Sequence, residues 1–227
     1  MARTMTLWKS AVGKKAVMAV SGILLFGFVL LHMLGNLKVY LGAQTYNHYA
    51  AWLRQVGEPL LPATCALWIA RIVLLVAVVL HIWSATSLTL TNWRARPVAY
   101  GTKEYAQADY AARTMRWGGV IIFLFVLYHL CQFTWGFHWA LPNFEEGNVY
   151  HNFVAGFSIW WVSLIYIVAN IALGFHLYHG LWSMFQSLGW NHPRYNLLQR
   201  RFAQIFALVI AVGNISFPLA VLIGIVK

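Results

Sequence analysis

Charged side chains are scarce in this chain of 227 residues, at 9% of the total, whereas soluble domains carry about 25%. Acidic residues are the rarest, with five Asp and Glu against 16 Lys and Arg. Cysteine occurs only at Cys65 and Cys131, which excludes an iron–sulfur cluster held by this chain alone. The sequence also lacks a C-x-x-C-H motif, so any haem is held without thioether bonds. No soluble domain, low-complexity segment or nucleotide-binding motif is evident.

Apolar residues make up most of the chain, 61% of the total, and they gather in long runs. A membrane-spanning helix needs about 20 apolar residues. Five segments meet this length, at roughly 16–37, 63–91, 117–140, 153–186 and 202–226. We therefore predict an all-α integral membrane protein, with residues 1–227 forming a single five-helix transmembrane domain.

Basic residues lie between the apolar runs, as expected for membrane topology rather than for nucleic-acid binding. Most of them fall in three segments, the N-terminus, the 92–116 loop and the 187–201 loop. Alternate crossings put these three segments on the same side, and positive charge marks the cytoplasmic side. The sequence thus predicts a cytoplasmic N-terminus and an outer C-terminus in the inner (cytoplasmic) membrane, with lipid around the bundle and no nucleic-acid partner.

Four histidines lie inside four separate apolar segments: His32, His81, His129 and His176. An ionisable side chain within a membrane span is expensive and therefore indicates a functional site. Neutral imidazole is a common ligand of haem iron. A single such histidine could simply bond to a neighbouring helix, but four in four helices favour two bis-histidine haems.

The depth of each histidine suggests how they pair. At ~1.5 Å per residue from the cytoplasmic ends, His32 lies ~24 Å deep, His129 ~18 Å, and His81 and His176 ~14 Å each. This order predicts that His32 pairs with His129 and His81 with His176. A nearby rival, His179, is less suitable than His176, because only His176 has small residues four positions away on both sides.

Three segments carry a resemblance to a known family: HMLGN at 32–36, LHIWSA at 80–85 with NWRARPVAY at 92–100, and FHLYHGLWSMFQSLGW at 175–190. The chain resembles, over essentially its whole length, the cytochrome b558 membrane-anchor subunit of succinate:quinone oxidoreductase. The similarity is to the single-polypeptide dihaem type, found in succinate dehydrogenase and fumarate reductase.

This resemblance implies two haem b groups, with a proximal haem on His81 and His176 and a distal haem on His32 and His129. It also implies partner flavoprotein and iron–sulfur subunits on the cytoplasmic face. Succinate would be oxidised in the flavoprotein, and electrons would pass through iron–sulfur clusters and haems to a quinone, usually menaquinone. The chain itself would hold no catalytic residue. Some fumarate-reducing relatives have a proton-linked glutamate two residues before the late proximal histidine, where this chain has Gly174.

Four polar residues are candidates for a quinone or for a haem propionate. Arg71 lies near the outer end of the second span, where it could instead snorkel to the interface. Lys38 and Asn36 follow His32 directly. Glu58 could relay protons to a quinone, or it could be a solvated loop carboxylate.

Two other functions fit part of the sequence. A cytochrome b subunit of a hydrogenase or formate dehydrogenase would also bind haem, but such partners lie mostly outside, and the basic surface here faces inward. A haem-free transporter could use the histidines as a proton relay, with paired acids or broken helices at mid-membrane. The absence of Asp and Glu from all five predicted spans argues against the transporter.

Overall fold

The computed structural model describes residue 8 and residues 10–95 and 110–227, with the side chains of 110–114 left aside. Its helices, in order, are α1 (Ala11–Asn36), the 3-10 helix η1 (Leu37–Leu41), α2 (Ala43–Gln55), α3 (Cys65–Arg94), α4 (Tyr110–Phe133), α5 (Val149–Phe157), α6 (Trp160–Ser187) and α7 (Pro193–Leu222). Parts of the basic segments, including Arg3, Lys9, Arg96 and Lys103, lie outside the described residues, as does 96–100 of the NWRARPVAY motif.

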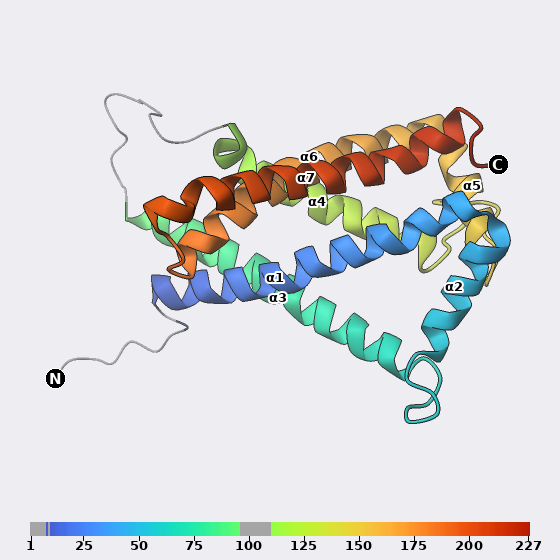
Figure 1. Ribbon diagram of the computed structural model, residues 1–227, viewed down its shortest axis with the longest axis horizontal. Helices are drawn as coiled ribbons and strands as arrows, with labels where there is room; N and C mark the ends of the chain where they lie inside the picture. The colour runs from blue at the N-terminus through green and yellow to red at the C-terminus, as the bar shows by residue number, and fades with distance from the viewer. Residues whose placement is uncertain (1–7, 9, 96–109) are drawn as a thin grey trace.

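In the described part of the chain, five helices are long and apolar enough to cross a membrane: α1 with η1, α3, α4 from Met115, α6 and α7. The prediction of an all-α, five-span membrane protein is therefore confirmed. Figure 1 shows α1, α4, α6 and α7 running roughly along the long axis of the molecule, α3 slanting away from α1, and α2 and α5 together at one end. The direction of crossing stays a prediction from the distribution of Lys and Arg.

The predicted end of the third span was wrong. The apolar pattern runs to residue 140, but α4 ends at Phe133, and 134–140 form turns. The chain leaves the helix with a bond from the Trp135 amide to the Leu130 carbonyl. Gly136 then takes a φ of 61°, in the left-handed region that favours glycine. Hydropathy does not register such a turn, because the turn residues are themselves aromatic and apolar.

The fourth predicted span, 153–186, is two helices rather than one. α5 ends at Phe157, and Ile159 is extended before α6 begins at Trp160. Two hydroxyls bond to carbonyls at this break, since Ser158 Oγ donates to Val154 O and Ser163 Oγ to Phe157 O, each at 2.7 Å. The break is thus stabilised without exposing unpaired backbone to lipid.

Smaller differences concern the other ends and one unexpected helix. α1 begins at Ala11, where Ser10 caps it by accepting a hydrogen bond from the Gly13 amide at 2.9 Å. The last span covers Pro193–Leu222 rather than 202–226. The segment 43–55 lies outside the five predicted spans, and it forms α2, whose 13 residues are too few to span a membrane.

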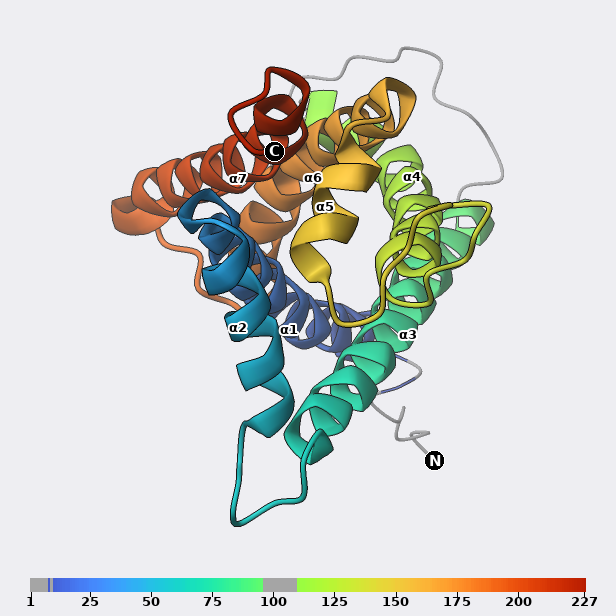
Figure 2. The same ribbon diagram turned by 90° about the vertical axis from the view of Figure 1, so that its right-hand side faces the viewer.

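The spanning helices pack in close couples. α6 lies along α7, α1 along α3, and α4 along α6, while α1 touches α6 and α7 less extensively. Figure 2 shows the bundle from the end that carries α2 and α5. The tightest core joins α6 and α7, where Val162, Ile210 and Ala203 are fully buried. α3 and α4 contribute few buried residues, so they sit at the margin of the packed core.

Candidate functional site: two histidine pairs between helix couples

The four histidines meet in two pairs, each across two helices. The ring centroids of His32 on α1 and His129 on α4 lie 5.8 Å apart, with an angle of 89° between the ring planes. The centroids of His81 on α3 and His176 on α6 lie 6.2 Å apart, with an interplanar angle of 59°. These are the two pairs that the depth estimate predicts.

Both separations suit two imidazoles that bind one metal ion from opposite sides. Metal–imidazole nitrogen bonds are about 2 Å long, which puts the two ring centroids about 6 Å apart. Two imidazoles in direct contact through a hydrogen bond could adopt a similar distance, so the separation alone does not identify a metal site. The residues around the rings therefore decide between a metal site and a direct hydrogen bond between the imidazoles.

The paired rings come from helices that do not pack closely on each other. Among the described residues, α1 packs on α3 and α4 packs on α6, but α1 with α4 and α3 with α6 are not close partners. Each histidine pair thus bridges the α1–α3 couple and the α4–α6 couple. None of the four histidines is fully buried, which fits side chains placed between helices that stay apart.

Glycines adjoin both rings of the His81–His176 pair. A Cβ at Gly22 on α1 would lie 3.5 Å from Cε1 of His81, and a Cβ at Gly119 on α4 would lie 3.8 Å from Cε1 of His176. Longer side chains at either position would extend into the ring. At these two positions no side chain extends toward the imidazoles, which suits a flat macrocycle bound between them.

On α4, His129 begins a chain of buried hydrogen bonds. Its Nδ1 lies 3.0 Å from the hydroxyl of Tyr166 on α6, and that hydroxyl donates to Oε1 of Gln132 at 2.8 Å. Tyr166 is 5% exposed and Gln132 is 0% exposed, so water does not compete for these bonds. Because the Tyr166 proton is directed to Gln132, its oxygen accepts from Nδ1–H of His129.

His81 has a similar partner on α1. Its Nδ1 lies 3.3 Å from Oγ of Ser21. The Ser21 hydroxyl donates to backbone carbonyls one turn back, at 2.7 Å to Val17 O and 3.1 Å to Met18 O. Its oxygen is therefore the acceptor for Nδ1–H of His81. In contrast, Nδ1 of His176 is buried and meets no hydrogen-bond partner among the described residues.

These features fit haem b better than a metal ion bound by protein alone. No group of three or more His, Cys, Asp or Glu side chains that could hold a metal occurs in the described part of the chain. Haem iron needs only two axial protein ligands, because the macrocycle supplies the other four. Two opposed imidazoles in each pair, and the glycines beside the His81–His176 pair, are consistent with that requirement.

The predicted quinone or propionate candidates do not gather at one place. Lys38 lines a cavity of about 410 Å³ together with Thr45, His48, Tyr49 and Trp52. Its Nζ lies 5.2 Å from the centre of the Tyr49 ring. Asn36 does not line this cavity and instead contacts α2, where its Oδ1 accepts a hydrogen bond from the Tyr46 hydroxyl at 2.8 Å.

Arg71 and Glu58 are both exposed. The Arg71 guanidinium lies over the Trp68 ring, 4.9 Å from its centre, on the same helix α3. This arrangement favours the interfacial, snorkelling interpretation of Arg71. Glu58 lies in the loop between α2 and α3, and no ion pair involves it among the described residues. Its exposure favours the solvated-carboxylate interpretation.

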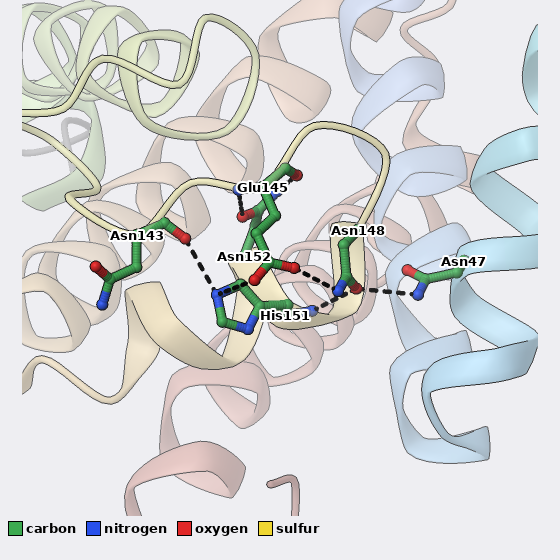
Figure 3. A network of polar contacts seen from close by, with 6 residues as sticks. All are labelled: Asn47, Asn143, Glu145, Asn148, His151 and Asn152. Atoms are coloured by element: carbon green, nitrogen blue, oxygen red, sulfur yellow. Dashed lines mark hydrogen bonds and ion pairs between the residues drawn. The ribbon is translucent and has the colours of Figure 1, made fainter.

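A polar network closes the end of the bundle near the His32–His129 pair (Figure 3). Asn47 of α2 donates to Oδ1 of Asn148 at 3.1 Å and accepts from the Tyr150 amide at 2.9 Å. Asn152 links both its oxygen and its nitrogen to the backbone of Glu145. The network therefore ties α2 to α5 and to the loop before α5. Nearby, burial raises the pKa of Tyr46, and Tyr49 adds to the effect.

Sequence reasoning missed three parts of the site: Tyr166, Gln132 and Gly119. Gln132 had a usable signal, because it follows His129 by three residues and so shares its helix face. Tyr166 and Gly119 had none, since each contacts a histidine on a different helix.

Compared with known proteins, the chain matches no family model, no curated protein and no solved structure.

Proposed function

We propose that this chain is a dihaem cytochrome b that anchors succinate dehydrogenase in the membrane and delivers its electrons to a quinone. The observation that carries the haem proposal is the pair of histidine bridges, His32–His129 and His81–His176, at ring separations of 5.8 and 6.2 Å. Each bridge joins two helices whose described residues do not pack closely on each other, α1 with α4 and α3 with α6.

In this proposal the protein's own residues hold and orient two iron ligands per site. When bound, two b haems at different depths would supply one-electron transfer across the bilayer. Ser21 and Tyr166 orient His81 and His129, so that Nε2 of each ring carries the lone pair for iron. Because the rings lie within the membrane-spanning helices, the bilayer would keep water from them.

The assignment to succinate dehydrogenase rests on the motifs around His32, His81 and His176. It brings with it cytoplasmic flavoprotein and iron–sulfur partners, menaquinone as the usual acceptor, and the inner membrane as the location. The basic ends of the spans would face those partners. The cavity beside Lys38 is our candidate for the quinone, because it lies just past His32 and combines aromatic walls with a cation.

Gly174 supports electron transfer without a glutamate in the late helix. A Cβ at this position would lie 3.2 Å from Cβ of Ala211 and 3.8 Å from the Ala207 carbonyl, both on α7. The position therefore faces the packed α6–α7 contact. A carboxyl side chain there would push the two helices apart, so a proton route through this position is not part of the proposal.

A reduced-minus-oxidised spectrum of the purified protein, with a haem-to-protein ratio, tests the haem proposal. We expect two b-type haems per chain. We expect His176→Ala to retain one haem and its matched neighbour His179→Ala to retain both. A chain purified from haem-replete membranes with no haem would refute the proposal and would favour a haem-free transporter.

A second assay tests the choice of enzyme. Partner subunits that copurify with the chain should reduce its haems when succinate is added, and malonate, a competitive succinate analogue, should block this reduction. Haem reduction by hydrogen or formate, with none by succinate, would instead identify the chain as the cytochrome b of another dehydrogenase.

A further inference from the structure

We infer that Tyr166, held by Gln132, is the residue that positions His129 and sets the electron affinity of the iron at the His32–His129 pair. This inference rests on the proposed haem function. It concerns a residue on α6 that touches neither the other pair nor the cavity beside Lys38.

The direction follows from the orientation of the Gln132 amide, whose Oε1 faces the Tyr166 hydroxyl while its Nε2 meets no hydrogen-bond partner among the described residues. Oε1 of Gln132 has no proton to give, so the Tyr166 hydroxyl donates to it at 2.8 Å. The same hydroxyl oxygen lies 3.0 Å from Nδ1 of His129 and can then only accept. Nδ1 of His129 therefore carries the proton, and Nε2 keeps the lone pair that an iron ligand needs.

Packing, rather than a hydrogen bond from its Nε2, holds the Gln132 amide in this orientation. It is fully buried, and a Cβ at Gly156 of α5 would lie 3.1 Å from its Nε2 and 3.0 Å from the Phe133 ring. The amide is thus packed against the backbone of α5, where a larger residue would not fit. The Tyr166 side chain is held by burial as well, since Tyr166 is only 5% exposed.

This bond has an electronic consequence for a metal on Nε2. An imidazole whose other N–H donates to an oxygen becomes a more basic ligand. A more basic axial ligand stabilises the oxidised iron, and hydrogen bonding around the ligands is one means by which proteins tune haem potentials. Removal of the Tyr166 hydroxyl should therefore raise the midpoint potential of the haem at this pair.

A purely structural role for Tyr166 is the alternative. Its ring packs edge-on against Phe125 and Phe157, each at a centroid distance of 4.8 Å, so the aromatic ring alone stabilises this region. Tyr166→Phe keeps the ring and removes only the hydroxyl. A shift in potential in that variant cannot come from lost ring packing.

Tyr128 provides a matched control. It lies beside His129 on α4, its ring is 6.4 Å from that of Tyr166, and its buried hydroxyl has no hydrogen-bond partner among the described residues. Tyr128→Phe thus removes the same group, at nearly the same place, without breaking a bond to the histidine.

The experiment is a redox titration of the α-band in the full chain, with the wave of the His32–His129 pair identified as the one lost in His32→Ala. We expect Tyr166→Phe to raise the potential of that wave and leave the other wave unchanged, while Tyr128→Phe moves neither. Equal shifts of both waves, no shift in Tyr166→Phe, or an equal shift in Tyr128→Phe would overturn the inference.

Gln132→Leu gives a second, independent test. Without the amide oxygen, the Tyr166 hydroxyl can donate to Nδ1 and favour the tautomer with the proton on Nε2. We expect this variant to retain less haem at the His32–His129 pair than Tyr166→Phe does. The double variant, Gln132→Leu with Tyr166→Phe, should retain as much haem as Tyr166→Phe alone. Equal retention in both single variants would contradict the proposed direction of the bonds. Wild-type protein without haem would refute the proposed function instead, so the two failures are distinguishable.

Discussion

Enlarging either glycine beside the His81–His176 pair should displace one haem and spare the other. A Cβ at Gly119 would lie 3.8 Å from His176, and a Cβ at Gly22 would lie 3.5 Å from His81, which are ordinary van der Waals distances. Alanine therefore fits at both positions. Leucine adds three carbons beyond Cβ, each bond about 1.5 Å long, and these atoms would occupy the space of the imidazole or of a group bound to it.

The expected magnitude follows from this geometry. Overpacking a closely packed site costs about 1–3 kcal/mol. Because about 1.4 kcal/mol corresponds to a tenfold change in an equilibrium constant, Gly119→Leu should weaken haem retention at this pair by roughly 5- to 150-fold. Gly119→Ala should retain both haems and stabilise α4 slightly, since Gly within a helix is about 0.5–1 kcal/mol less favourable than Ala.

Haem content and redox titration of the purified variants provide the measurement. We expect Gly22→Leu and Gly119→Leu each to approach one haem per chain, and the surviving wave should be the one that His32→Ala removes. The alanine variants should retain both waves with unchanged potentials. Two full haems in both leucine variants, or loss of the wave belonging to His32–His129, would refute the reasoning about these glycines.

Three further variants test other contacts. Ser21→Ala removes the acceptor for His81 and should raise the midpoint potential of the redox wave of the His81–His176 pair alone. An unchanged potential would show that the 3.3 Å contact has no influence. Asn47→Ala removes two hydrogen bonds between α2 and α5, which should cost about 1–3 kcal/mol and lower the thermal midpoint, whereas exposed Gln44→Ala on the same helix should not; equal midpoints would contradict this role. Gly174→Glu should separate α6 from α7 and lower the yield of folded chain, and normal stability with both haems would argue against close packing at this residue.

The membrane architecture was predictable because each spanning helix is determined by the composition of its own segment. Each span is a local run of apolar residues, and bilayer thickness sets its length. The break at Ile159 was not predictable in this way, because Ile159 is apolar and the bonds from Ser158 and Ser163 that stabilise the break are specific contacts. The turn at Gly136 was not predicted for the same reason, because a specific backbone hydrogen bond rather than local composition forms it.

The histidines were predictable as candidates because their cost in a membrane is also local. Their partners were not, since Tyr166 and Gly119 act on residues of other helices, and spacing along one helix carries no information about a neighbour. Depth alone suggested how the rings pair, and the helices indeed bring those rings together. Whether the pairs bind haem stays a prediction.

The two kinds of contact made by the histidines divide along the helix couples. Ser21 and His81 belong to α1 and α3, which pack together, and Tyr166 and His129 belong to α6 and α4, which also pack together. The orienting hydrogen bonds therefore lie within a couple, whereas the ring pairs span two couples. Both oriented histidines lie on α3 or α4, the spans with the fewest buried residues. A helix held by little packing fixes the rotation of its side chains poorly, so a hydrogen bond from the better-packed neighbour supplies the missing constraint. At each histidine pair, the double variant Ser21→Ala with Tyr166→Phe should consequently lose more haem than the corresponding single variant loses there. The reason is that each hydrogen bond holds one of the two helix couples that both pairs join. Haem losses in the double variant that equal the sum of the single losses would show instead that the two sites are independent.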